Sequence, residues 1–202
     1  MQFSIPMMNV VTRSQKKTRE VISVLIGDKS KFAFQISNID CNGQCEFGMY
    51  VNGADVLEGV IKGKRQKYCW NIDEIINCFQ ESKNELHSDD PYPVSVSGNS
   101  AAELYANSFH FAGNEEEEFD WYTQVQNWLF RHSWVNASAG SYLATVFFRR
   151  VGENMEISWD NSNHPYVAFV NQQGKYCVDL MEFDKTVDVL CRSYCELKSK
   201  GK

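Results

Sequence analysis

Four of the cysteines are spaced so that their thiolates could bind one metal ion. Cys41 and Cys45 are separated by Asn-Gly-Gln, and Cys191 and Cys195 lie one helical turn apart in a predicted helix. Four thiolates in a tetrahedron are a common zinc ligand set, but this spacing is not that of a zinc knuckle. Buried free cysteine is also a common core residue. The sequence leaves metal binding by Cys41, Cys45, Cys191 and Cys195 open, and we expect no cofactor.

A second candidate group combines Glu156, Asp160 and His164. Glu156 and Asp160 have the same parity in a predicted strand, so they share one of its faces. That face is opposite Ile157 and Trp159, and we expect it to be exposed to solvent. These three residues carry an alternative hypothesis, a metal-dependent hydrolase. The leading interpretation is that the chain is not an enzyme.

The motifs of the commonest enzyme classes are absent from the sequence. It contains no G-x-S-x-G, P-loop, H-E-x-x-H or Rossmann glycine pattern. Each of these motifs places a nucleophile, a phosphate or a metal, so the usual hydrolase, nucleotide-binding and zincin functions are not indicated. The histidines are scattered, and an isolated histidine is more often a partnered or exposed imidazole than a catalytic base.

The charge balance argues against nucleic acid as a general partner. The 202 residues carry a formal net charge of −6, whereas affinity for nucleic acid comes largely from Lys and Arg that neutralise phosphates. Two local basic clusters keep a nucleic-acid-binding adaptor as a further alternative. They consist of Arg13, Lys16, Lys17 and Arg19, and of Lys62, Lys64, Arg65 and Lys67.

An acidic block beside aromatic residues is the most distinctive candidate surface. Asn114 is a predicted N-cap, and the four glutamates after it would form a first helical turn that the helix dipole favours. The predicted buried face of this helix carries Phe119, Tyr122, Val125, Leu129 and His132, with Trp121 and Trp128 on a flanking line. Acidic and aromatic side chains together suit a basic surface on a protein partner. We expect partner contacts from Glu115, Glu116, Glu117, Glu118, Trp121 and Trp128.

The remaining composition predicts a cytoplasmic protein. No segment approaches the roughly 18 consecutive apolar residues of a membrane helix. Residues 1–11 lack a signal-peptide pattern because Pro6 and Asn9 interrupt them. The chain has 7 cysteines, and an odd number in a chain of this length fits reduced thiols better than a disulfide framework.

Hydrophobic periodicity predicts strands in both halves of the chain, each set followed by helices. In the N-terminal half we expect a short edge strand at residues 3–7, a hairpin of residues 21–26 and 32–36, and a meander that continues to residue 70. In the C-terminal half we expect two hairpins, one joining 142–148 to 155–160 and one joining 166–170 to 175–178. Ser100 with Glu103, and Asp179 with Glu182, are predicted helix caps.

These elements predict an α+β fold of mostly antiparallel sheets with about four helices packed on one side. Residues 1–202 would form a single domain. Turn signals concentrate in residues 87–99, so any subdivision would fall there.

Part of the C-terminal half resembles a known group of sequences. The motifs are Phe147 to Gly152, Met155 to Asn161, Val167 to Val170 and the capped helix that contains Phe183. They resemble an uncharacterised family of small bacterial proteins, similar in size and acidity to the immunity proteins of polymorphic-toxin systems. The resemblance covers roughly residues 120–197 and implies no catalytic residue.

The resemblance implies a bacterial origin and a role in bacterial conflict. With the acidic and aromatic surface, it favours an immunity protein or an accessory protein of antiphage defence. We expect its partner to be a protein, either a toxin or a defence effector, which it neutralises or regulates.

Overall fold

The computed structural model describes residues 23–40, 42–110 and 113–200. These residues form three antiparallel sheets and five α-helices, which confirms the predicted α+β class. The strand predicted at residues 3–7 and the basic cluster of residues 13–19 lie outside the described part of the chain.

The N-terminal sheet contains the predicted hairpins of its first three strands, but the rest of the predicted meander is wrong. Residues 59–61 and 64–66 pair in a separate small sheet, and residues 68–71 pair with residues 44–47, where Tyr68 is buried in the core. The neighbours in the N-terminal sheet are, in order, β1, β2, β3 and β4, and β7 also pairs with β3. Phe32, Phe34 and Ile36 are buried on one face of β2, because every second residue of a strand points the same way. The strands are β1 (Ser23–Asp28), β2 (Phe32–Ser37), β3 (Gln44–Val51), β4 (Ala54–Asp55) and β7 (Tyr68–Asn71).

The C-terminal sheet has β9 at its centre, between β8 and β11. β8 and β9 form a hairpin, with Val151 opposite Asn154 at its end. The first strand of this hairpin begins five residues later than predicted, because residues 142–146 are not part of a strand. A third, small sheet places β5 between β6 and β10. The strands of these two sheets are β8 (Phe147–Val151), β9 (Asn154–Asp160), β11 (Gln173–Asp179), β5 (Gly59–Ile61), β6 (Lys64–Gln66) and β10 (Ala168–Phe169).

The predicted hairpin between residues 166–170 and 175–178 is wrong. β10 pairs with β5, where Phe169 lies opposite Gly59, and β11 pairs with β9, where Tyr176 lies opposite Ile157. Val167 and Phe169 become buried at the small sheet. Burial against a strand more than a hundred residues away outweighs a local turn signal, because apolar burial stabilises wherever the partner lies in the sequence.

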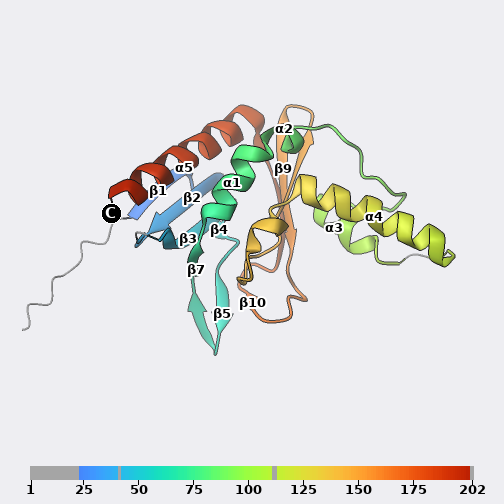
Figure 1. The fold of residues 1–202 in the computed structure, drawn as a ribbon, viewed down its shortest axis with the longest axis horizontal. Coiled ribbons are helices and arrows are strands. Elements are labelled where there is room, and N and C mark those ends of the chain that lie inside the picture. Colours follow the sequence, from blue (N-terminus) through green and yellow to red (C-terminus); the bar gives the residue numbers. More distant parts are fainter. Residues whose placement is uncertain (1–22, 41, 111–112, 201–202) are drawn as a thin grey trace, which may run out of the picture.

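Helices cover both faces of the C-terminal sheet, although the sequence suggested one side. On β8, Phe148 contacts Phe183 of α5 with ring centroids 5.8 Å apart. Its neighbour Phe147 points the other way, to Tyr105 of α3 at 5.3 Å. Figure 1 shows α5 above the N-terminal strands and α3 with α4 on the far side of β9. The helices are α1 (Asp73–Glu81), α2 (Lys83–Leu86), α3 (Ala101–Asn107), α4 (Glu115–His132) and α5 (Leu180–Lys200), and a 3-10 helix, η1, spans Val135–Ser138.

An aromatic cluster joins the two large sheets. Phe79 of α1 lies within 6.4 Å, centroid to centroid, of Phe34, Trp134, Phe148 and Phe183. Edge-to-face contacts of this kind add to the free energy gained from apolar burial. No helix in the described ranges combines the length and apolar character needed to cross a membrane.

Candidate protein-binding surface

The start of α4 is fixed by the predicted capping box. The Asn114 side chain accepts hydrogen bonds from the backbone N–H groups of Glu116 and Glu117, at 3.1 and 3.0 Å. In return the Glu117 carboxylate accepts from the Asn114 N–H at 3.3 Å. These bonds satisfy N–H groups that have no partner within the helix. Hydrogen bonds between residues close in sequence therefore hold the acidic first turn in place.

The second half of α4 carries its buried face. Val125, Trp128, Leu129 and His132 are buried, and Trp128 stacks on His132 with centroids 4.4 Å apart. Phe119 is 72% exposed, so its predicted burial is wrong. The reason is visible in Figure 1, where the first half of α4 extends beyond the C-terminal sheet. The helix meets the sheet only along its last turns.

The structure separates the six residues predicted to contact a partner. The glutamates 115–118 are exposed in the first turn of α4. Trp121 is partly buried, and its indole Nε1–H donates to the backbone oxygen of Ser108 at 2.8 Å. Trp128 is 0% exposed, because α3, Tyr92 and Phe147 surround it. In the folded chain, Trp128 therefore presents no surface to solvent.

The aromatic residues that lie beside the glutamates are not the predicted Trp128 but Phe119, Tyr122 and Phe109. A shallow groove along α4 is lined by Glu115, Glu118, Phe119, Tyr122, Thr123, Gln126 and Asn127. Phe109 is 46% exposed, and its ring lies 6.1 Å from that of Tyr122. We call this surface the α4 patch and define it as Glu115, Glu116, Glu118, Phe119 and Tyr122. Exposed rings beside carboxylates provide both apolar area and charge for a partner.

Glu156 is part of a buried charge network that sequence reasoning missed. Its side chain is 1% exposed, so the predicted exposure is wrong. One carboxylate oxygen accepts from the Ala101 N–H at 2.7 Å and the other from Arg149 at 2.6 Å. Lys175 lies 3.6 Å away. A buried carboxylate requires such partners. The sequence contained one sign of this contact: α3 begins with two alanines, and small side chains let the end of a helix approach a strand closely.

Glu156, Asp160 and His164 do not form a metal-binding group. Asp160 is exposed and accepts from Ser162. His164 Nδ1 accepts from the Val167 N–H at 3.2 Å, and burial lowers the pKa of this imidazole. Within the described ranges, no three His, Cys, Asp or Glu side chains are placed to hold a metal ion. The hydrolase hypothesis therefore gains no support from this neighbourhood.

Two of the four cysteines predicted as possible metal ligands, Cys45 and Cys191, are buried in the core. Cys41 lies outside the described residues. Burial raises the pKa of Cys45 to about 12 and that of Cys191 to about 11. A thiol must lose its proton to ligate a metal or to act as a nucleophile. At neutral pH both buried thiols keep their protons, so neither is a ready metal ligand or nucleophile. Cys195 is exposed.

Comparison with known proteins adds one distant structure. No family model and no curated protein sequence matches this chain. Among solved structures, the crystal structure of CdiI from Burkholderia dolosa AUO158 matches at 16% identity and a TM-score of 0.38. The match covers 84% of this chain and 99% of that chain. At this TM-score the likeness carries no inference, so a proposal of function has to rest on the surface described above.

Proposed function

We propose that this protein is a cytoplasmic binding protein without catalytic activity that acts as an immunity protein in bacterial conflict or antiphage defence. It neutralises or regulates a toxin or defence effector by covering a basic surface of that partner. One observation carries the proposal: α4 presents three exposed glutamates next to the exposed ring of Phe119, on a helix end that extends beyond the sheet.

The arrangement suits recognition of a basic surface for a physical reason. The exposed carboxylates and the overall charge of −6 would attract a cationic partner and speed the encounter. Phe119 and Tyr122 would then bury apolar area at the centre of the contact, where aromatic residues contribute most of the binding free energy. Residues 120–197 also resemble an uncharacterised bacterial family that is similar in size and acidity to immunity proteins, which is consistent with the same function.

The contact is tested with a variant that leaves the capping box intact. Glu115→Gln, Glu116→Gln, Glu118→Gln and Phe119→Ser remove the charge and the ring but keep Asn114 and Glu117. Affinity capture from the native host, read by mass spectrometry, should recover a basic protein with the wild type and lose it with the variant. A matched control, Glu196→Gln with Met181→Ser, changes exposed residues on α5 and should keep the capture.

Neutralisation is tested separately with the captured protein. When the captured partner is produced alone in a bacterial host, it should arrest growth. Co-production of the wild-type chain described here should restore growth. The α4 variant should protect at least tenfold less well, in line with the loss of a binding hot spot. If the captured protein is harmless, or if the α4 variant protects fully, the proposal is wrong.

A further inference from the structure

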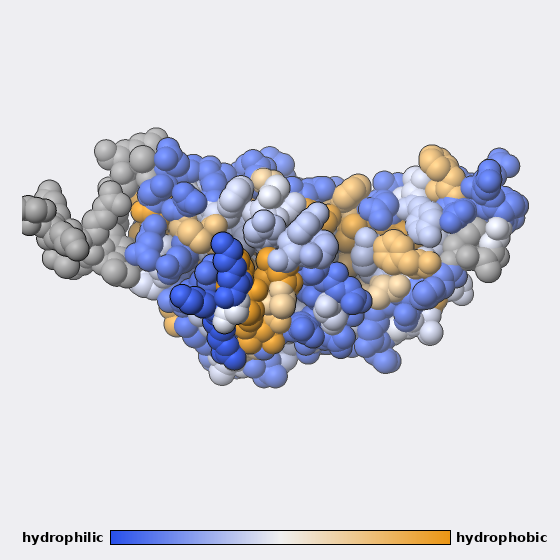
Figure 2. Space-filling view, turned by 90° about the horizontal axis from the view of Figure 1, so that it is seen from below, coloured by the Kyte–Doolittle hydropathy of each residue, from blue (hydrophilic) through white to orange (hydrophobic). Residues whose placement is uncertain are grey.

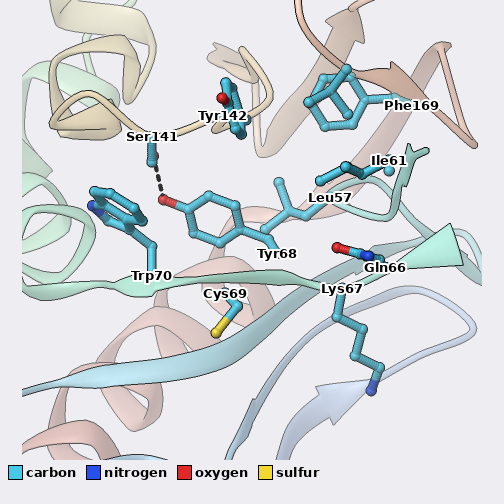
Figure 3. Close-up of a pocket in the computed structure, with 12 residues that line it drawn as sticks. Leu57, Ile61, Gln66, Lys67, Tyr68, Cys69, Trp70, Ser141, Tyr142 and Phe169 are labelled. Atoms are coloured by element: carbon cyan, nitrogen blue, oxygen red, sulfur yellow. Dashed lines mark hydrogen bonds between the residues drawn. The ribbon is translucent and has the colours of Figure 1, made fainter. Parts of the chain in front are cut away.

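A hollow lies against the small sheet, apart from the α4 patch. Its volume is about 220 Å³. Figure 3 shows Tyr68 and Trp70 on β7, with Tyr142, Ile61 and Phe169 facing them from other segments. The lining residues are Leu57, Gly59, Ile61, Gln66, Lys67, Tyr68, Cys69, Trp70, Ser141, Tyr142, Val167 and Phe169. Segments from both halves of the chain therefore build one hollow.

The interior of the hollow offers apolar contact and few free hydrogen-bonding groups. The hydroxyls of Tyr68 and Ser141 bond to each other at 2.6 Å, and the Ser141 hydroxyl also donates to the Ser138 carbonyl at 2.5 Å. Burial raises the pKa of Tyr68 to about 12, so its hydroxyl stays neutral. Because these two hydroxyls are already paired and most of the other lining side chains are apolar, an apolar side chain suits the hollow better than a polar group.

Exposed aromatic rings border the hollow. Trp70 is 38% exposed and Tyr142 is 51% exposed. Tyr166 is 77% exposed, and its ring lies 6.0 Å from that of Tyr142. Figure 2 shows a hydrophobic strip in the middle of this face, beside strongly hydrophilic surface. Contiguous exposed apolar surface with a polar border is typical of an interaction site.

The polar border on the side of the β5 to β6 hairpin is basic. Lys62, Lys64 and Arg65 are exposed there. Lys64 shares a face of β6 with Gln66, which lines the hollow, whereas Arg65 lies 3.9 Å from Glu58. None of the described lining residues is acidic. The border would therefore attract negative charge.

We propose that this hollow binds an acidic segment of a partner protein, which inserts one large apolar side chain between Trp70, Tyr142 and Phe169 while its carboxylates face the lysines of the hairpin. The site is distinct from the α4 patch and has the opposite charge, so the proposal extends beyond the proposed function. Single-stranded nucleic acid is the competing occupant, because aromatic rings and lysines also bind it. The paired hydroxyls and the aliphatic walls favour the peptide.

The test uses a fluorescein-labelled peptide with one phenylalanine between three glutamates on each side, and reads fluorescence anisotropy with the full-length protein at low salt. Binding should weaken about tenfold when alanine replaces the phenylalanine of the peptide, the usual loss for a buried anchor. A labelled oligothymidylate is measured in parallel. Tighter binding of the oligonucleotide, or no peptide binding up to millimolar concentration, would overturn the proposal.

Variants assign the binding to the hollow. Trp70→Ala should weaken peptide binding about tenfold, and Tyr142→Ala serves the same purpose if the first variant does not fold by circular dichroism. Lys64→Glu should weaken binding on the order of threefold at low salt, as expected for one peripheral charge. Lys185→Glu reverses an exposed lysine on α5 and should change nothing. Equal binding by the wild type and by both aromatic variants would also overturn the proposal.

Discussion

Glu156 shows how a single buried charge positions a helix at the residue scale. Its carboxylate accepts from the first N–H of α3 and from Arg149 of β8, and Ser158 adds a third bond at 3.1 Å. These hydrogen bonds compensate the free-energy cost of burying the Glu156 charge, and they connect α3 to the C-terminal sheet. α3 in turn covers Trp128, so this network supports the part of α4 that anchors the α4 patch.

Replacing Glu156 should therefore destabilise the fold. Glu156→Gln removes the negative charge and leaves the Arg149 guanidinium, which is 22% exposed, without its ion-pair partner. We expect the free energy of unfolding to fall by about 3 kcal/mol, the usual cost of breaking a buried pair, measured by chemical denaturation. Asp160→Asn, a change on the same strand at an exposed residue, should cost less than 0.5 kcal/mol. Equal costs for the two variants would contradict this assignment.

His132 makes stability depend on pH. Burial, together with the positive charges of Arg131 and Arg149, lowers the pKa of this imidazole below its usual 6.5. The folded chain then keeps His132 neutral at pH values where the unfolded chain binds a proton. Stability is unaffected by this group above pH 6.5 and falls as the pH drops below it.

We therefore expect the free energy of unfolding to be lower at pH 5.5 than at pH 7.5. Denaturation of the wild type and of His132→Phe at both pH values measures this difference, because the variant should lack this part of the pH dependence. The quantity compared is the change in unfolding free energy between the two pH values, for the wild type and for the variant. A change in absolute stability caused by the larger ring therefore does not affect the comparison. Equal changes in the two proteins would show that His132 does not titrate in this range.

At the scale of elements, α4 has two halves with different roles. The last turns hold Trp128 and Leu129 against α3 and Phe147, and the first turns carry the capping box and the exposed α4 patch. The local caps let the helix continue past the sheet without tertiary contacts for its first residues. Substitutions in the α4 patch should therefore leave the core intact.

Two alanine substitutions on α4 should have very different costs. Trp128→Ala removes a side chain that is 0% exposed and should lower the free energy of unfolding by about 3–5 kcal/mol. Phe119→Ala removes a ring that is 72% exposed and should cost less than 0.5 kcal/mol. Both are measured by denaturant unfolding. Similar costs would mean that α4 presents a different face to the sheet.

At the scale of the whole molecule, contacts distant in sequence join the two halves. β10 of the C-terminal half pairs with β5 of the N-terminal half, and α5 packs on strands of both large sheets. One core cluster contains Ile26 near the beginning of the described chain and Tyr194 near its end. A shared core of this kind favours cooperative unfolding.

We expect one unfolding transition for the full chain. Far-ultraviolet circular dichroism and tryptophan fluorescence should give the same midpoint in guanidinium chloride. Native-state hydrogen exchange should assign similar opening free energies to the central amides of β3 and β9. Two separate midpoints, or clearly different exchange free energies, would favour a subdivision near residues 87–99.

The sequence alone determined the features that depend on neighbours in the chain. These are the hairpins from β1 to β3 and from β8 to β9, the caps at Ser100, Asn114 and Asp179, and the acidic first turn of α4. Each follows from bonds or alternation within a few residues. The sequence therefore predicted the α+β class and the glutamates of the candidate site.

Only the tertiary structure decided which of these side chains are available for binding. Trp128 is buried and Phe119 exposed because α4 meets the sheet along its last turns alone. Glu156 is buried because α3 covers a face that alternation marks as polar. The hollow below the small sheet exists because β10 joins β5. Burial is set by whatever packs against a residue, and that partner can lie anywhere in the chain.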